Sequence, residues 1–292
     1  MSTLTGQLTA DERARFLEAA RLGGLWYVHN QNAPGQWWGG VDESADEGRF
    51  LYEYFPATGY CRGAGVWSQG IATCALASLA RVEDVVDRKL FGPAAELGAG
   101  YLKSLQFLDS RFEKSYGAFR EHTPQTPWGS CRDGASGCFA LAMMGRLASE
   151  AQTAIETWTP AGQADCLERA DLFCRWYNRH GSQPDKWPYR FFRHDTGVSL
   201  EVADPAEVDG RPETWHGQSR IVVGNDDFAT LFHLAAFLAL EDERFLDLAR
   251  RRVAWMLAAR VHISNIGSDQ NRMAHFHSRR AGVFRNSRII TN

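Results

Sequence analysis

The stretch WYVHNQNAPGQWWGG, Trp26 to Gly40, places a glutamine five residues after an aromatic side chain and follows it with a glycine and a further tryptophan. With a preceding glycine, this first copy consists of Gly23, Trp26, Gln31, Gly35 and Trp37. A second copy keeps the order, with a longer insertion before its later glycine, and consists of Gly98, Tyr101, Gln106, Gly117 and Phe119. The chain therefore contains an internal repeat, which a ligand platform alone would not require.

This repeat resembles the QW repeat of the squalene-hopene cyclase and prenyltransferase superfamily, whose fold is an α/α toroid also found in some carbohydrate-active enzymes. The resemblance implies that the glutamine caps the end of an outer helix and that the aromatic ring stacks across to the neighbouring one. On that basis Gln31 and Trp37 form a clasp between outer helices and carry no chemistry. Only Trp38, outside the repeated pattern, stays a candidate for contact with a ligand.

Hydrophobic periodicity predicts helices of two kinds along the rest of the chain. A capping box at Thr9 and Glu12 predicts a first helix from about Ala10 towards Tyr27. Helices that are apolar on every face, and therefore buried all round, are predicted over 66–80, 135–148 and 228–240. Amphipathic helices, which should lie outside, are predicted over 94–108, 165–179 and 243–260.

The alternation of apolar and amphipathic helices predicts an all-α fold, an α/α toroid built as a ring of helical hairpins with little or no sheet. No change of composition divides the chain, so residues 1–292 are expected to form a single domain. A complete ring of six hairpins would be tight in 292 residues, and an incomplete or shortened toroid is the alternative. Residues 262–292 are polar and basic without a clear period, and their structure is left open.

The charge balance argues against nucleic acid or an anionic membrane as a partner, because the formal net charge is -3. The N-terminus has no signal-peptide pattern, and no segment offers the about 18 uninterrupted apolar residues that a membrane span requires. We therefore expect a soluble, cytoplasmic protein whose partner is a small-molecule or oligosaccharide substrate. No sequence feature indicates an oligomeric state.

The six cysteines contain no C-x-x-C pair, and several stand in apolar helical patterns. They are interpreted as reduced core residues. The zinc-dependent protein prenyltransferases have an aspartate two residues before a cysteine, whereas Asp133 and Cys138 are five residues apart. Neither a metal nor another cofactor is expected.

Three carboxylates stand at the predicted starts of apolar helices and are the first catalytic candidates: Asp133, Asp226 and Asp227. A hydrolase needs one protonated and one ionised carboxyl group, and neighbouring carboxylates can split their pKa values in that sense. The structural alternative is that Asp133 and Asp226 only stabilise helix N-termini through the helix dipole. Both interpretations stay open at this point.

A lyase or epimerase would instead need a base near a sugar carbon, for which Tyr116, His122 and His216 are candidates. An arginine such as Arg132 or Arg190 would neutralise a uronate. Flat aromatic faces suit sugar rings, and the remaining loop candidates for substrate binding are Arg62, Trp67, Trp128, Trp187, Tyr189 and Trp215. The leading hypothesis is a carbohydrate-active enzyme, a polysaccharide lyase, glycoside hydrolase or sugar epimerase, that acts on an acidic glycan.

Two other functions compete with this hypothesis. Class II terpenoid cyclases use the middle aspartate of a D-x-D-D-T-A motif as their acid, and GNDDFA, 224–229, keeps Asp226 and Asp227 but lacks the first aspartate and the threonine. A cyclase-like enzyme with Asp226 as general acid is therefore the alternative. A non-catalytic toroid that binds a glycan or peptide is the third. Two residue groups are expected to be structural, the solvated run Arg250 to Arg252 and the core residue His233.

Overall fold

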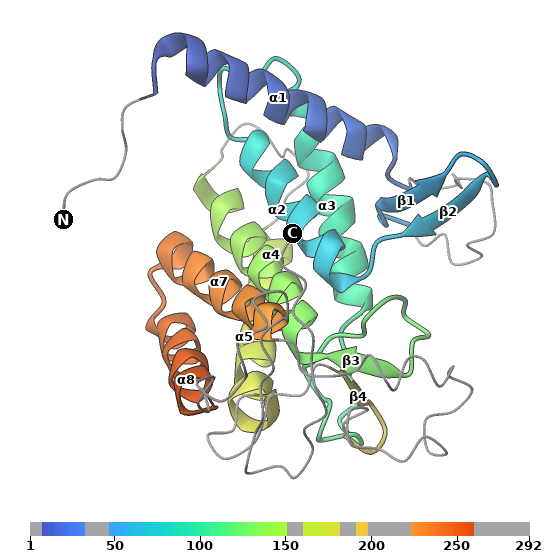
Figure 1. The fold of residues 1–292 in the computed structure, drawn as a ribbon, viewed down its shortest axis with the longest axis vertical. Helices are drawn as coiled ribbons and strands as arrows, with labels where there is room; N and C mark the ends of the chain where they lie inside the picture. Colours follow the sequence, from blue (N-terminus) through green and yellow to red (C-terminus); the bar gives the residue numbers. More distant parts are fainter. Residues whose placement is uncertain (1–7, 33–46, 151–159, 182–190, 198–222, 260–292) are drawn as a thin grey trace, which may run out of the picture.

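The computed structural model describes residues 8–32, 47–150, 160–181, 191–197 and 223–259, and these ranges are mainly helical (Figure 1). The inner layer consists of α2 (Val66–Leu79), α4 (Cys131–Glu150) and α7 (Val223–Leu240). The outer layer consists of α1 (Ala10–His29), α3 (Arg88–Ser104), α5 (Pro160–Trp176) and α8 (Glu243–Ala259), and the π-helical turn η1 (Tyr177–Gly181) continues α5. Two antiparallel pairs complete the elements: β1 (Leu51–Phe55) with β2 (Tyr60–Gly63), and β3 (Trp128–Ser130) with β4 (Phe191–Arg193). The prediction of an all-α fold with little sheet is confirmed.

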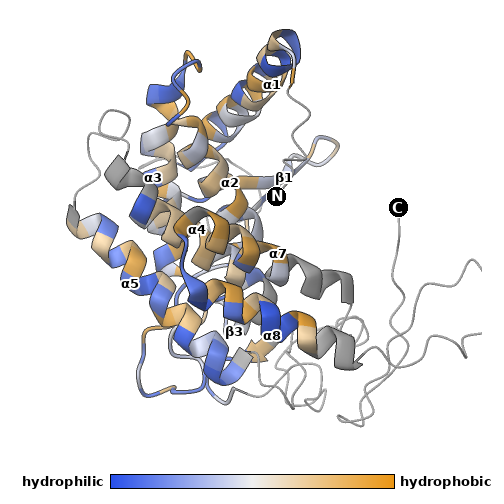
Figure 2. Cartoon of the chain, turned by 90° about the vertical axis from the view of Figure 1, so that its left-hand side faces the viewer, coloured by the Kyte–Doolittle hydropathy of each residue, from blue (hydrophilic) through white to orange (hydrophobic). Residues whose placement is uncertain are grey.

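The inner helices pack side by side in the order α2, α4, α7, and the outer helices cover them. Figure 2 shows α4 and α7 as largely apolar, whereas α1, α5 and α8 carry polar faces. Rings of Phe139 in α4 and Phe232 in α7 lie 6.3 Å apart, and the Arg146 guanidinium donates to the Leu240 carbonyl oxygen at 2.7 Å. These two contacts show that α4 and α7 run parallel, as the inner helices of an α/α toroid do.

The helix boundaries agree with the predictions in most places. The Thr9 hydroxyl accepts from the Glu12 amide at 3.2 Å and the Glu12 carboxylate accepts from the Thr9 amide at 2.9 Å, which confirms the capping box. The third helix was predicted to begin after Pro93, but α3 begins at Arg88 and contains this proline. Proline removes one helical hydrogen bond, and Phe91, two residues before it, is fully buried in the core.

Two predictions of burial were wrong. Helix α2 is not buried all round, because Ile71, Ala75 and Ser78 are exposed along one face of this edge helix. In the predicted solvated arginine run, Arg250 is exposed, but Arg252 is only 1% exposed and its guanidinium lies 6.0 Å from the Tyr177 ring centre. Arg252 faces inward because it occupies the side of α8 that packs on the neighbouring helices. The expectation that His233 is a core residue is confirmed, with 1% exposure.

The two repeated glutamines make equivalent contacts in the structure. The Gln31 amide nitrogen donates to the carbonyl oxygens of Gly48 and of Ala94 in α3, at 3.0 and 2.9 Å. The Gln106 amide nitrogen donates in the same way to Gly117 at 2.9 Å and to Arg169 in α5 at 3.0 Å. Each glutamine therefore joins the end of one outer helix to the next outer helix.

The glycine and aromatic residue that complete the first clasp differ from the predicted pair. Gly35, Trp37 and Trp38 lie outside the described residues. Gln31 forms an antiparallel β-bridge with Phe50, and Gln106 forms one with Phe119. Gly48 and Phe50 therefore take the places in the first clasp that Gly117 and Phe119 take in the second. Both glycines have positive φ, 82° at Gly48 and 100° at Gly117, a conformation that favours glycine. The sequence does not show this correspondence, because Gly48 follows Gln31 by 17 residues whereas Gly117 follows Gln106 by 11.

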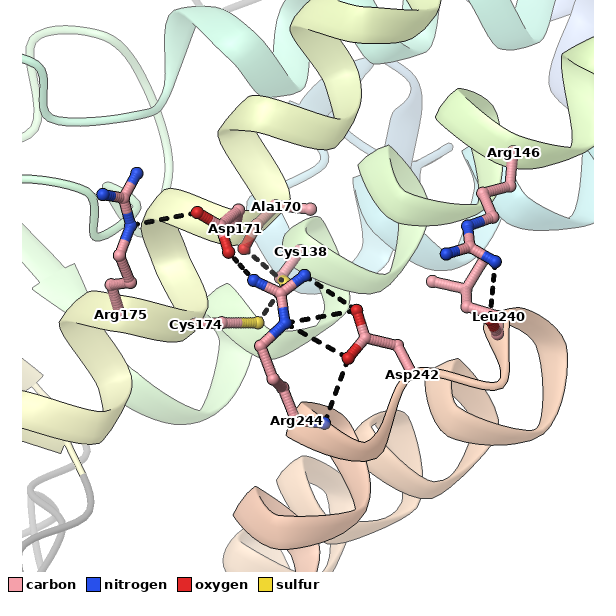
Figure 3. Close-up of polar contacts among 9 residues, drawn as sticks. All are labelled: Cys138, Arg146, Ala170, Asp171, Cys174, Arg175, Leu240, Asp242 and Arg244. Carbon is pink, nitrogen blue, oxygen red and sulfur yellow. Dashed lines mark hydrogen bonds and ion pairs between the residues drawn. The ribbon is translucent and has the colours of Figure 1, made fainter.

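The seam between α4, α5 and α8 contains thiols and an arginine (Figure 3). The sulfur atoms of Cys138 and Cys174 lie 3.8 Å apart, and Arg244 forms ion pairs with Asp171 and Asp242 beside them. Cys61, Cys74, Cys138, Cys166 and Cys174 are all free and buried, as predicted. Burial raises the pKa of the Cys166 thiol to about 11, so this thiol stays protonated at neutral pH.

Candidate functional site

The candidate site is the end of the inner layer at which α2 and α4 begin. The loop that follows the second clasp reaches this end, because the Val66 amide at the start of α2 donates to the Glu121 carbonyl oxygen at 2.8 Å. The Glu121 amide donates in turn to the Trp128 carbonyl oxygen of β3 at 3.2 Å. The segment around Glu121 is therefore held between the start of α2 and the strand that leads into α4.

His122 is the exposed group of this segment. The Tyr101 hydroxyl of α3 donates to the His122 carbonyl oxygen at 2.8 Å. A Cβ atom added at Gly65 would lie 2.9 Å from His122 Nδ1, so the absence of a side chain at Gly65 leaves room for the imidazole. The imidazole also meets the Trp128 ring edge-on, with 6.4 Å between ring centres. His122 thus combines an exposed ring with a fixed backbone.

Asp133 is fully buried in the first turn of α4. The Ser130 hydroxyl oxygen accepts from the Asp133 amide at 3.0 Å, so Ser130 acts as a helix N-cap. One turn further along α4, the Ser136 hydroxyl donates to the Trp67 carbonyl oxygen at 2.8 Å. Asp133 and Ser136 are three residues apart and share a helix face, which places Asp133 on the side of α4 towards α2. This position suits both the helix-stabilising and the catalytic interpretation.

The parallel packing of α4 and α7 relates Asp133 to the acidic pair of α7. Residues 139 and 232 face each other, and residues 146 and 240 do so near the other end. Continued to the start of both helices, this register sets the backbone of Asp226 level with that of Asp133. Asp227 follows in the same turn of α7. The side chains of Asp226 and Asp227 lie outside what the structure describes, so the predicted convergence of the three carboxylates stays a prediction.

Four further predicted residues are placed by the structure. Trp67 and Trp128 are half-buried, and the Trp128 ring centre lies 6.4 Å from that of His122. Arg62 lies on the β1–β2 hairpin and forms an ion pair with Glu53 at 2.9 Å. Tyr116 is 36% exposed, and Gly117 beside it packs on the outer helix α5.

The remaining predicted residues fall where side chains are not described. Arg132 belongs to α4, but only its backbone is described. The other candidates lie outside the described ranges: Trp187, Tyr189, Arg190, Trp215 and His216.

Tyr101 and Ser130 position the site and were not predicted to do so. Tyr101 was named as the aromatic residue of the second repeat copy, and its sequence gives no sign that its hydroxyl reaches another loop. Ser130 was detectable, because a serine three residues before an aspartate at a helix start is a capping pattern. Arg120 beside the site has a structural role, because its guanidinium lies 4.2 Å from the Phe107 ring centre and burial lowers its pKa.

No protein-family model matches the chain, and no curated protein matches its sequence. Among solved structures, the fold is similar to that of the cellobiose 2-epimerase from Spirochaeta thermophila DSM 6192, with a TM-score of 0.50 and 13% sequence identity. The match covers 92% of this chain and 58% of that protein, so the chain spans little more than half of the epimerase's length. At this identity the likeness supports the α/α fold. None of the described helices combines the length and hydropathy needed to cross a bilayer.

Proposed function

We propose that this chain is a carbohydrate-active enzyme that epimerises a sugar at the end of the inner layer where α2 and α4 begin. The observation that carries the proposal is the placement of the exposed His122 imidazole beside Trp128 and against Gly65 at the start of α2. The cellobiose 2-epimerase activity of a protein with the same fold supports this choice among the carbohydrate reactions. An exposed histidine and the partly exposed Arg62–Glu53 ion pair of the hairpin suit a sugar better than an isoprenoid chain.

The chemistry requires proton transfer at the carbon next to the carbonyl group of an open-chain sugar. His122 would remove that proton, and the electron pair of the broken C–H bond would form the double bond of an enediolate. Return of a proton to the opposite face of the same carbon yields the epimer without net change of atoms. Imidazole suits this role because it titrates near neutral pH. The flat faces of Trp67 and Trp128 would hold the closed ring of the neighbouring sugar unit.

The second proton-transfer group must lie across the sugar from His122. Asp133 and Asp226 are the candidates, because the starts of α4 and α7 lie level in the register described above. A carboxyl group in the first turn of a helix is held firmly by the backbone, which favours a fixed geometry. In this arrangement His122 and one carboxyl group would exchange roles between the two directions of the reaction.

The test is incubation with cellobiose and a panel of neutral and acidic disaccharides in D2O, followed by proton NMR. An epimerase gives a new epimer with deuterium at the inverted carbon. His122→Gln should lower this rate by about 100-fold or more, whereas His29→Gln at the end of α1 serves as the matched control and should leave it unchanged. Absence of deuterium from every sugar, or an unchanged rate in His122→Gln, would refute the proposal.

Glycoside hydrolysis is the second candidate, and the level placement of Asp133 and Asp226 favours it. Neighbouring helix axes lie about 8–10 Å apart, a separation that lets two carboxyl groups flank a glycosidic bond. The same NMR spectra distinguish the reactions, because hydrolysis releases monosaccharides and a lyase leaves an unsaturated sugar. Asp226→Asn would then abolish cleavage, and Asp11→Asn, at an exposed carboxylate in the first turn of the outer helix α1, is its control.

A further inference from the structure

We propose that one face of the β1–β2 hairpin is a separate subsite that binds a neutral sugar ring of an oligosaccharide. The inference rests on the proposed function, because it assigns a glycan substrate to the same end of the molecule. The hairpin leads directly into α2: β2 ends at Gly63, and α2 begins at Val66 beside Glu121. A glycan bound at the candidate site can therefore extend over the hairpin.

The strand register gathers the relevant side chains on one face. Glu53 is paired with Arg62, and Phe55 is paired with Tyr60. Directly paired residues of an antiparallel hairpin point to the same side, and positions two residues apart along a strand share that side. The register shifts at Tyr52, and this bulge brings the Tyr52 ring to 5.0 Å from the Arg62 guanidinium. Tyr54 is paired with Cys61 and belongs to the opposite face.

The face offers exposed aromatic surface next to hydrogen-bonding groups. Tyr52 and Phe55 are 40% and 46% exposed, and the Phe55 and Tyr60 rings lie 5.6 Å apart. Arg62 and Glu53 lie between these rings, with side chains 46% and 35% exposed. Aromatic rings contact the C–H faces of a sugar, while the guanidinium donates to its hydroxyl groups and the carboxylate accepts from them. Large exposed apolar side chains in such a cluster indicate a binding surface.

The ion pair determines which sugar fits. Arg62 Nη2 lies 2.9 Å from Glu53 Oε1, so the positive charge of Arg62 is already neutralised by a carboxylate. A uronate carboxylate at this place would meet Glu53 as well as Arg62, and like charges repel. A neutral ring meets no such penalty. Arg62 was expected to help bind an acidic glycan, and its pairing instead favours neutral sugars at the hairpin.

Binding is tested by isothermal titration of the full chain with oligosaccharides of glucose, xylose and mannose and with an oligogalacturonate of equal length. We expect at least one neutral probe to bind and the uronate to bind more weakly. Tyr52→Ala combined with Phe55→Ala should weaken neutral binding about tenfold or more. Tyr54→Ala removes a tyrosine that is 56% exposed on the opposite face and should have no effect. An equal loss of neutral-sugar affinity in Tyr54→Ala would overturn the inference, and so would a wild type that binds no neutral oligosaccharide.

A gain of binding provides a sharper test, since a purely structural role of the ion pair cannot produce it. Glu53→Gln keeps the size of the side chain and frees the Arg62 charge, so it should strengthen binding of the oligogalacturonate several-fold. An unchanged uronate affinity would contradict the assigned role of the ion pair. A turnover assay of the wild type separates this inference from the proposed function: if the wild type binds a neutral sugar at the hairpin but turns over no sugar, only the catalytic proposal fails. Turnover without any hairpin binding refutes only the subsite.

Discussion

The two glutamine clasps share their main-chain contacts but support different loops. In both, a glutamine at the end of one outer helix donates to a glycine of positive φ and to a carbonyl oxygen of the next outer helix. The first clasp also receives Gln69 of α2, whose amide nitrogen donates to the Gly48 carbonyl oxygen at 2.8 Å. The second clasp has Gln106 alone on the Gly117 oxygen among the described residues. The first clasp is therefore reinforced and the second is not.

The comparison shows that the clasps support the fold, whereas the segments that follow them carry the candidate chemical groups. After the first clasp the chain forms the β1–β2 hairpin, and after the second it forms the loop that presents His122. Both segments then enter an inner helix. The clasps fix where α2 and α4 begin, while the inserted loops differ in the side chains that they bring to that end of the molecule.

Replacing a clasp glycine should have the largest effect on stability. A Cβ atom at Gly48 would collide with the Leu97 carbonyl oxygen of α3, and the residue would have to keep its φ of 82°. We expect Gly48→Ala to lower the free energy of unfolding by about 2–4 kcal/mol, measured by urea denaturation. Gly59→Ala is the control, because Gly59 also has positive φ but no atom lies within 4 Å of the added Cβ. An equal loss of unfolding free energy in Gly48→Ala and Gly59→Ala would show that the positive φ alone, and not the contact in the clasp, causes the loss.

The loop that leaves the second clasp can be disturbed without touching the clasp itself. A Cβ atom at Gly65 would lie 2.7 Å from the Glu121 carbonyl oxygen and 2.9 Å from the His122 ring. Gly65→Ala should displace His122 and lower the epimerisation rate by about 10- to 100-fold, measured by the NMR assay. Gly100→Ala, with no atom within 4 Å of its added Cβ, is the matched control. A normal rate in Gly65→Ala would remove His122 from the mechanism.

The reinforcement of the first clasp makes the two glutamines unequal in energy. Gln106→Leu leaves the buried Gly117 carbonyl oxygen without this donor and should cost about 2 kcal/mol. Gln31→Leu should cost about 1 kcal/mol, because Gln69 still donates to Gly48. Denaturation curves of the two variants measure the difference directly. Combined Gln31→Leu and Gln69→Leu should exceed the sum of the single changes, and simple additivity would argue against the shared oxygen.

The smallest effect is expected from the ion pairs that accompany the second clasp. Burial tends to raise the pKa of Asp165, but hydrogen bonds from Lys103 of α3 and Arg169 outweigh it and lower that pKa. Because the folded-state pKa is lowered, the pairing stabilises the protein above the ordinary pKa of about 3.9 and this contribution is lost as the pH falls through the folded value.

Asp165→Asn should therefore cost under about 1 kcal/mol near neutral pH, since the carboxylate is partly exposed. The difference from the wild type in urea denaturation should narrow below about pH 4. Glu83→Gln, at an exposed carboxylate in the turn between α2 and α3, is the charge-matched control. A difference that does not change with pH would assign the effect of Asp165 to packing.

The helices could be predicted from the sequence because caps and hydrophobic periods are local signals. Thr9 and Glu12 fixed the start of α1, and the apolar pattern located α4 and α7. The partner glycine of Gln31 could not be found in this way, because Gly48 follows the glutamine by 17 residues, whereas Gly117 follows Gln106 by 11. Gly35 and Trp37, which stand closer to Gln31 in the sequence, fit the repeat pattern as well. Only the main-chain contacts with α3 distinguish the two possibilities.

For the site, the sequence identified residue types and the structure supplied their surroundings. Asp133 was selected because it opens an apolar helix, and His122 because it is a possible base in a polar loop; both are properties of the local sequence. The effect of Gly65 on His122 and that of Glu53 on Arg62 depend on strands and loops that meet only after folding. Arg252 was misplaced for the same reason, since its buried position depends on the helices packed against α8.

The shared starting end of the inner helices also gives the molecule an electrical polarity. Each helix carries partial positive charge at its N-terminus and partial negative charge at its C-terminus, and parallel neighbours add their fields. At the far end, the Arg146 guanidinium meets the Leu240 carbonyl oxygen and balances the negative pole of α7. At the near end the positive pole of α2 lies beside the loop of His122, and Asp133 stands in the first turn of α4. An enediolate formed there would have its oxygen charge stabilised by the backbone before any side chain moved.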